Sequence, residues 1–440
     1  MPFFLKKSAS LKRNKDESEN ISKIKRKKDE EISSDEDLSG NDIGYVESSS
    51  EEETEQERKL KFAKKYIEKI REEEQEKGED AISQRLREEA LDQQGKFIKE
   101  KANEYENAIP EIVAVFRQPA SITAIVVSSS EKFFFSASKN CSIVKWSIEE
   151  KRKLKFIPGG KKGTEGTHCG HTAHVLSLAL SSDDKYLASG CRNNIIHIWD
   201  ADTLELLKTF KGHKGAITGL VFLKGSHELV SASDDKLVKL WNVDEMCYID
   251  TIGGHEEGVT GLDSFSTESA ITCGGRDNSV RVWKIVEDRP VAYKGSGASL
   301  DCITGSSFRT FISGGDDGAL LAWANEEKKK PMFRVPMAHG ADPETNLGNW
   351  IISLTTLPNT DLVASGSKDG FIRLWKRDDN KHSLVLISRI PVIGFVNSLK
   401  FSLSGNYLVA GIGQEHRLGR WWRMKEAKNS IVLYSWKNKS

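Results

Sequence analysis

The sequence predicts an all-β fold, a β-propeller of seven blades, with a charged N-terminal extension that is disordered and then helical. Three observations predict it. From about residue 111 onward, short runs alternate apolar and polar residues, and turns rich in Gly, Ser, Asp and Asn separate them. Seven similar segments each end in a tryptophan. These tryptophans are 40–53 residues apart, the length of one four-stranded blade.

The seven segments show the repeat directly. In chain order they are FFFSASKNCSIVKW (Trp146), YLASGCRNNIIHIW (Trp199), LVSASDDKLVKLW (Trp241), AITCGGRDNSVRVW (Trp283), FISGGDDGALLAW (Trp323), LVASGSKDGFIRLW (Trp375) and YLVAGIGQEHRLGRW (Trp421). Each segment is two strands joined by a tight turn, as in the WD-repeat signature. A seven-bladed WD-repeat propeller is therefore predicted for residues 111–436.

Polar residues recur at fixed places in the repeat. An Asp stands six residues before the Trp in four copies, where it can accept turn N–H groups and hold a His of the preceding loop. Candidate histidines are His171, His213, His255 and His339. We interpret the set as a structural hydrogen-bond network; its predicted members are His213, Asp235, Trp241, His255, Asp277, Trp283, Asp317 and Asp369. Blades one, two and seven have Asn140, Asn193 and Glu415 instead, so their turns are expected to differ.

Ring closure has two candidate strands. Residues 111–118 (EIVAVFRQ) align with the outer strand that precedes a blade, and residues 430–436 (SIVLYSW) follow the last repeat tryptophan at the offset of an outer strand. An open sheet edge invites aggregation, so one of them is expected to close blade seven. The sequence leaves the choice open.

The N-terminal extension divides into two parts. Residues 1–56 carry blocks of opposite charge and are predicted to be disordered. The run KIKRKK is typical of a nuclear import signal, with candidate residues Lys23, Lys25, Arg26, Lys27 and Lys28. Ser33, Ser34 and Ser48 to Ser50 precede acidic residues and are candidate phosphorylation sites. Residues 57–107 have a narrow apolar stripe at helical spacing, and the sequence does not decide whether they fold alone.

Composition excludes several classes of protein. The formal net charge is zero, yet the first 110 residues carry 23 Lys and Arg against 29 Asp and Glu, which leaves the propeller net basic. No segment is apolar enough for a signal peptide or a membrane span. Six scattered cysteines form no metal-spaced pair, and enzyme motifs are absent. We therefore expect a non-catalytic protein with no cofactor, metal or small-molecule substrate.

Two long linkers depart from the repeat. The linker between blades one and two contains Lys161, Lys162 and His168 among flexible glycines, and lysines on such a loop suit phosphate contacts. A solvated basic loop is the alternative. The insertion at residues 326–350, between blades five and six, has a Pro-containing, mixed-charge composition more typical of a protein-contact loop.

Blade seven departs most, with the segment GQEHRLGRWWRMKEAKNS. On a strand, alternation would place Trp421 in the core as the blade tryptophan and Trp422 on the opposite face beside Arg420. Trp422 would then stack on a base, or lodge between neighbouring blades. Candidate RNA-binding residues here are Arg417, Arg420, Trp422 and Arg423.

The same segments resemble a known family. GQEHRLGRWWR, KEAKNS, SASKNCSIVKWS, FIPGGKKGTEGTHCGH and the N-terminal EQERKLKFAKKYIEKIREEE are similar to the U3 small nucleolar RNA-interacting WD-repeat family. The resemblance implies a nucleolar core subunit of the U3 small nucleolar ribonucleoprotein, a box C/D particle that guides early cleavages of pre-ribosomal RNA. It implies binding to the box B/C kink-turn of U3 RNA with the small kink-turn-binding protein in place, and contact with other proteins of the particle and of the small-subunit processome.

A second hypothesis is a protein-only scaffold or substrate receptor. Its partners would stay attached after nuclease treatment, whereas U3 RNA would co-purify with a particle subunit. The sequence does not tell which propeller face would contact RNA.

Overall fold

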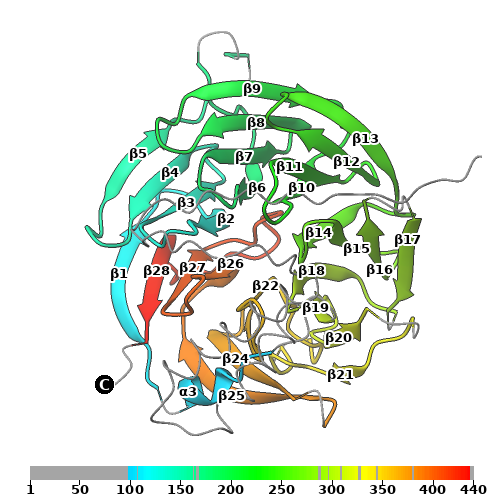
Figure 1. Ribbon diagram of the computed structural model, residues 1–440. Coiled ribbons are helices and arrows are strands. Elements are labelled where there is room, and N and C mark those ends of the chain that lie inside the picture. The colour runs from blue at the N-terminus through cyan, green and yellow to red at the C-terminus, as the bar shows by residue number, and fades with distance from the viewer. Residues whose placement is uncertain are drawn as a thin grey trace, which may run out of the picture. The chain divides into compact units, whose positions relative to one another are not determined.

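The fold is a ring of seven four-stranded antiparallel sheets, seen down its axis in Figure 1. The computed structural model describes residues 98–436, apart from 107, 162, 165–167, 286–288, 296, 308–309, 326–328, 343–344 and 379–380. The prediction of a seven-bladed propeller is confirmed.

Six blades use four consecutive strands each. Blade one comprises β2 (Ile122–Val127), β3 (Phe133–Ser138), β4 (Ile143–Ser147) and β5 (Lys153–Ile157); blade two β6 (Val175–Leu180), β7 (Tyr186–Cys191), β8 (Ile195–Asp200) and β9 (Leu206–Lys211); blade three β10 (Ile217–Phe222), β11 (Glu228–Ser233), β12 (Leu237–Asn242) and β13 (Cys247–Gly254). Blade four comprises β14 (Val259–Ser264), β15 (Ser269–Gly274), β16 (Ser279–Lys284) and β17 (Arg289–Lys294); blade five β18 (Leu300–Gly305), β19 (Thr310–Gly315), β20 (Leu320–Ala324) and β21 (Phe333–Val335); blade six β22 (Ser353–Thr356), β23 (Leu362–Gly366), β24 (Phe371–Asp378) and β25 (Ser383–Pro391).

Blade seven joins the two ends of the propeller chain. Its inner strands are β26 (Phe395–Phe401) and β27 (Tyr407–Gly413), its third strand is β28 (Ser430–Ser435), and its outer strand is β1 (Glu111–Arg117). β1 pairs antiparallel with β28, from Glu111 opposite Ser435 to Arg117 opposite Ser430. Of the two candidate segments, residues 111–117 therefore supply the outer strand that closes the ring, and residues 430–435 form the third strand of the same blade.

Apolar side chains pack between neighbouring sheets. The middle strands are buried almost throughout, as in β11, because another blade covers each face, whereas outer strands such as β13 expose several residues. Between blades two and three, Phe210 of β9 stacks on Trp241 of β12 with ring centroids 4.9 Å apart. Burial of one large side chain contributes about 1.5–3 kcal/mol, so the inter-blade layers are the main stabilising contacts.

The prediction that Trp421 is the core tryptophan of blade seven is wrong. Its side chain is 63% exposed, and Trp436, at 6%, stands at the end of the third strand instead. The physical reason is an insertion: residues 414–429 leave the sheet after β27, and the chain returns only at Ser430. The alternation of a strand therefore does not apply to the two tryptophans in it.

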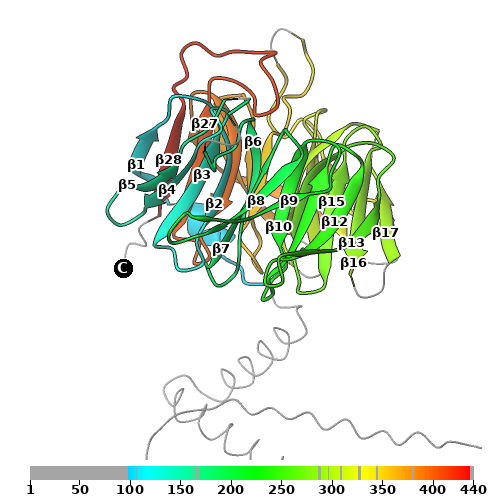
Figure 2. The same cartoon turned by 90° about the horizontal axis from the view of Figure 1, so that it is seen from above.

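The connections of the blades define two faces. Because successive strands are antiparallel, the loop entering each inner strand and the turn between the second and third strands lie on the same face. Residues 158–174, 336–352 and 414–429 are all connections of this kind. We call their side the insertion face. In Figure 2 the red loop after β27 and a yellow loop project together beyond the ends of the strands.

The only helix in the described part of the chain, α3 (Ala102–Glu106), packs on the opposite face. The Asp361 carboxylate accepts the N–H groups of Lys101 and Ala102 at 2.8 and 3.0 Å, which satisfies donors at the helix start. Tyr105 donates to the carbonyl oxygen of Gly405 at 2.7 Å. The end of the predicted helical segment is thus held by the propeller.

The remaining N-terminal expectations lie outside the described residues. These are the disordered segment 1–56, the import residues Lys23, Lys25, Arg26, Lys27 and Lys28, the candidate phosphorylation sites, and residues 57–97 of the helical segment. Among the described residues, no helix is long and apolar enough to cross a membrane.

Candidate nucleic-acid interface

The predicted polar network has its full form in blades three, four and six. In blade four, His255 Nδ1 bonds an Asp277 oxygen at 2.9 Å, and its Nε2 lies 2.6 Å from the Thr272 hydroxyl, which accepts from Trp283 Nε1 at 2.8 Å. The equivalent groups are His213, Asp235, Ser231 and Trp241 in blade three and His339, Asp369, Ser365 and Trp375 in blade six. These side chains form hydrogen bonds with one another inside the fold, so their role is structural.

Asp317 of blade five does not share this arrangement. Its carboxylate accepts from Arg334 at 2.7 Å and from the Ala319 N–H at 3.0 Å. The loop before its blade, residues 295–299, contains no histidine. The expected membership of Asp317 in a His–Asp pair is therefore wrong, although its carboxylate still caps the turn.

The insertion 414–429 of blade seven is tied down at its base. The Asn429 side chain accepts the Gln414 N–H at 2.8 Å, and the Gln414 side chain donates to the Ala427 carbonyl at 2.7 Å. A β-bridge joins Glu415 to Arg423. Hydrogen bonds thus fix the backbone at the base of this projecting segment. They thereby restrict where the side chains beyond the base can lie.

Lys139 of blade one anchors the same insertion. Its ammonium group donates to Glu415 at 3.3 Å and to the Gly419 carbonyl at 3.0 Å, and the Lys139 and Glu415 side chains are only 8% and 12% exposed. Burial lowers the pKa of Lys139, and Glu415 opposes this shift. This pair joins blades seven and one on the insertion face.

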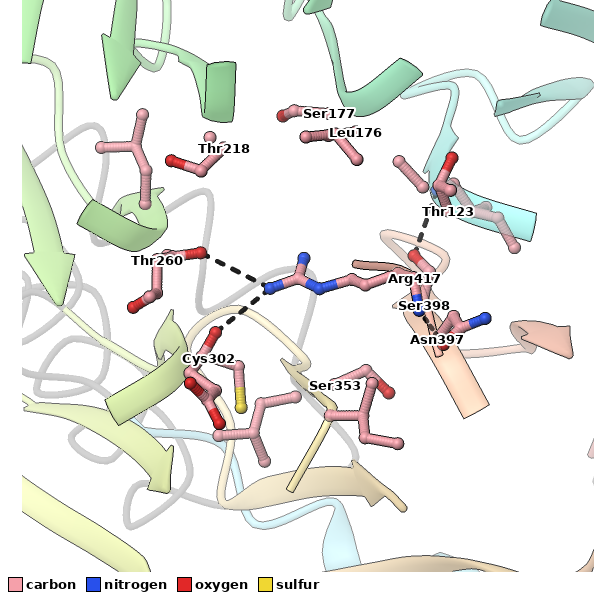
Figure 3. Close-up of a pocket in the computed structure, with 18 of the residues that line it drawn as sticks. Thr123, Leu176, Ser177, Thr218, Thr260, Cys302, Ser353, Asn397, Ser398 and Arg417 are labelled. Atoms are coloured by element: carbon pink, nitrogen blue, oxygen red, sulfur yellow. Dashed lines mark hydrogen bonds between the residues drawn. The ribbon is translucent and has the colours of Figure 1, made fainter. Parts of the chain in front are cut away.

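Arg417, one of the predicted RNA-binding residues, turns inward. Its guanidinium group donates across the central channel to the carbonyl oxygens of Asp301 at 3.2 Å and Thr260 at 3.5 Å, as Figure 3 shows. The half-buried Asp301 carboxyl lies nearby, and its partial burial raises its pKa to about 6, with a further contribution from Asp316. Arg417 therefore lines the central channel.

Neither of the two neighbouring tryptophans is a core residue of blade seven, and they differ in what they contact. Trp422 is 44% exposed and packs edge-on against Trp350 with ring centroids 5.1 Å apart, while the Lys368 ammonium lies 4.9 Å from its ring. Trp421, at 63%, contacts only the ring of His416 among the aromatic contacts of the described residues. Trp421 is the indole that remains available for stacking.

The other predicted residues lie mostly at the surface. Arg420 is 81% exposed and donates to Glu415 at 3.1 Å, and exposed Arg423 donates to the amide oxygen of Gln414 at 3.3 Å. Lys161 is exposed on the loop between blades one and two. His168 of that loop lies 2.9 Å from the Thr164 hydroxyl, so it stabilises the loop. Lys162 lies outside the described residues.

Charge is unevenly distributed around the insertion face. The connections of blades seven, one and two present exposed cations, which we call the basic arc: Lys161, Arg192, Arg420, Arg423, Lys425 and Lys428. The connections of blades three to six are rich in carboxylates: Asp234, Asp235, Glu256, Glu257, Asp277, Asp316, Asp317, Asp342 and Asp369. Phosphate groups would therefore be attracted to one side of this face.

The sequence interpretation missed Arg192, Lys428 and Trp421 as surface residues of one site. The order of blades around the ring brings them together, since Arg192 belongs to a turn of blade two and Lys428 to the insertion of blade seven. Assigning every turn to a face from strand order would have found the cations. No group of three or more His, Cys, Asp or Glu side chains suited to a metal occurs among the described residues.

Comparisons with known proteins agree with this architecture. The model of the WD domain, G-beta repeat, matches residues 110–147, 163–200, 204–242, 246–284 and 343–376. The human "U3 small nucleolar RNA-interacting protein 2" is 51% identical over 391 residues, which cover 87% of this chain and 82% of the human protein. The Arabidopsis thaliana "U3 snoRNP-associated protein-like YAO" is 33% identical, over 73% of this chain and 68% of that protein.

Solved structures give the same result. The structure titled "Structure of U3-55K" matches with a TM-score of 0.71 and 46% identity, covering 74% of this chain and all of that one. "Crystal structure of RRP9 WD40 repeats" has the same TM-score at 45% identity, with 75% of this chain covered. From the extent and identity of these matches, the chain belongs to the family of U3 small nucleolar RNA-interacting protein 2.

Proposed function

We propose that the chain is a non-catalytic RNA-binding subunit of the U3 small nucleolar ribonucleoprotein and acts in pre-ribosomal RNA processing in the nucleolus. Its RNA target is the box B/C kink-turn of U3 small nucleolar RNA, bound together with the kink-turn-binding box C/D protein, and its other partners are proteins of the U3 particle and the small-subunit processome. The relatives include a U3 small nucleolar RNA-interacting protein, a U3 snoRNP-associated protein and the yeast "Ribosomal RNA-processing protein 9", and these names support the particle and the process.

The basic arc is the observation that supports RNA contact most directly. A kink-turn is recognised through its shape and backbone, so cations that follow the phosphates matter more than base-reading groups. Arg420 and Arg423 project from a segment whose base is held by hydrogen bonds of Gln414 and Asn429, so ordering these cations on binding costs less. Trp421 adds an exposed ring that can stack on an unpaired base.

The decisive experiment measures binding of the purified full chain to a U3 box B/C RNA preassembled with the kink-turn-binding protein. We expect the double variant Arg420→Glu/Arg423→Glu to weaken binding by at least about tenfold, because it removes two cations and adds two anions at the phosphates. Lys161→Glu combined with these changes is expected to weaken binding further. Affinity is read by fluorescence anisotropy at several salt concentrations.

The matched control is Lys214→Glu/Lys236→Glu, two exposed lysines on the same face above blade three. This variant is expected to bind within about twofold of the unaltered chain, since it lies in the carboxylate-rich sector. If both double variants bind equally well, the RNA site is elsewhere. If the tagged chain retains its cellular partners after nuclease treatment and U3 RNA does not co-purify, the protein-only scaffold is correct instead.

A further inference from the structure

A groove of about 750 Å³ lies on the insertion face between blades six and seven. Four segments line it: residues 339, 341, 342 and 349 of the loop before β22, residues 368–371 and 373 at the start of β24, residues 392–395 between the two blades, and residues 422–424 of the blade-seven insertion. This volume lies within the range of protein pockets that bury a ligand's surface. Of the residues that line the groove, the RNA-binding proposal uses only Arg423.

The groove exposes large apolar side chains on both sides. Ile393 is 68% exposed, Trp422 44% and Phe371 36%, while Val392 and Phe395 form a buried floor at 6% and 2%. Single exposed apolar residues are ordinary, but several that line one concave surface are typical of a contact site.

Its walls are fixed before any ligand binds. Trp422 is held between the edge of Trp350 and the ammonium of Lys368. Gly394 in the floor has a φ of +131°, and a Cβ atom there would lie 2.7 Å from Cγ2 of Ile412, so only glycine allows this close approach. Because the groove is already ordered, little conformational entropy is lost there when a partner binds.

The charges of the groove leave one cation without a carboxylate. Asp342 forms an ion pair with Lys368, and Asp369 pairs with Arg373 at 2.9 Å while it also bonds His339. Arg423 donates only to the neutral amide of Gln414 among the described hydrogen bonds, and no described ion pair includes it. The groove therefore favours a ligand with one negative group beside apolar ones.

We propose that this groove binds a short extended peptide segment of another protein, with two apolar side chains between Ile393, Phe371 and Trp422 and a carboxylate on Arg423. A peptide fits better than RNA because, among the described cationic residues of the groove, only Arg423 lacks a carboxylate partner, whereas an RNA strand needs a series of cations. This inference goes beyond the proposed RNA function and does not rest on it.

The test selects from a displayed library of random 16-residue peptides against the immobilised full chain. Selected peptides are then synthesised and titrated by fluorescence polarisation. We expect a consensus of two apolar residues near an Asp or Glu, at least a tenfold loss of affinity in Ile393→Glu, and a comparable loss for acidic peptides in Arg423→Glu. The matched control is Leu403→Glu, because Leu403 is 64% exposed on the opposite face. It should leave affinity unchanged, and all variants should keep the melting temperature of the unaltered chain.

Several outcomes would overturn the proposal. One is a consensus without acidic residues, or peptide binding that survives Ile393→Glu. Another is loss of U3 RNA binding in Ile393→Glu, which would make the groove part of an RNA site. A dimer in sedimentation that Ile393→Glu dissociates would show a second copy as the occupant. Tight binding of a synthetic peptide of residues 29–56 would show the chain's own acidic segment there.

Discussion

Blades four and seven are built from the same four-strand plan but use their polar residues differently. In blade four, His255, Asp277 and Trp283 are buried and joined through Thr272, so none of them is available to a partner. In blade seven no His–Asp pair is found among the described residues, and the corresponding tryptophan, Trp436, is buried with no hydrogen-bond partner for its Nε1 there. An insertion replaces the short turn.

The difference shows where a repeat protein can place function. A buried network stabilises only while every member is satisfied, so its residues cannot be changed for binding. Where the network is missing, Lys139 and Glu415 hold the insertion in its place, and Arg420, Trp421 and Arg423 are left at the surface. In its described residues, blade seven therefore lacks the buried His–Asp network of blade four and instead exposes charged and aromatic side chains.

The largest expected effect is on the free energy of unfolding, and it distinguishes the tryptophan of blade four from the exposed tryptophan of blade seven. Trp283→Ala should lower the free energy of unfolding by about 3–5 kcal/mol, because Trp283 is 2% exposed and its loss leaves a cavity and removes the hydrogen bond from its indole to Thr272. Trp421→Ala should change it by less than about 0.5 kcal/mol. Urea denaturation of both variants measures this. Equal destabilisation would mean that Trp421 is a core residue.

Acid should weaken blade seven through His416. This side chain is buried, and burial, with smaller contributions from Arg417 and Lys139, lowers its pKa to about 3. Its unfolded pKa is about 6.5, so the folded state binds fewer protons, and stability is lost as the pH falls from about 6.5 toward 3. At pH 5 this amounts to about 2 kcal/mol. In blade four, Asp277 partly opposes the lowering of the His255 pKa.

Intrinsic tryptophan fluorescence and thermal unfolding between pH 7 and pH 4.5 measure the effect of His416. The His416 ring lies 5.9 Å from that of Trp421, so fluorescence reports on the insertion. His416→Gln should flatten the pH dependence of unfolding. An unchanged profile would show that another group titrates.

Much of the fold followed from periodicity, whereas the site did not. The repeat of Trp and Asp predicted seven blades, and their burial in blades three, four and six agrees with the predicted network, because short-range turn chemistry determines both. The strand pattern failed at Trp421, where a 16-residue insertion, 414–429, separates the second and third strands without a change in composition that marks its ends. Periodicity also could not show that Arg417 points into the channel, since that depends on carbonyl groups more than 100 residues away.

Trp421 should contribute to RNA binding while it contributes nothing to stability. Trp421→Ala is expected to weaken binding of the U3 box B/C RNA by about 1–3 kcal/mol if the ring stacks on a base. Trp421→Phe should retain most of the affinity, because a smaller aromatic ring still stacks. Anisotropy titrations compare the two variants with Trp422→Ala, whose ring is already packed on Trp350. Equal losses in Trp421→Phe and Trp421→Ala would exclude stacking.

The smallest effect compares the two sectors of the insertion face. Each cation that contacts a phosphate releases counterions, so Arg420→Ala should reduce the slope of log K against log salt by about 1 and cost about 1 kcal/mol or less in affinity. Lys236→Ala should leave the slope unchanged, although Lys236 is exposed on the same face. Arg420→Ala and Lys236→Ala each remove one positive charge, so the change in net charge cannot explain a difference between the two variants. If the slope of log K against log salt is the same in these two variants, the RNA phosphates do not follow the basic arc.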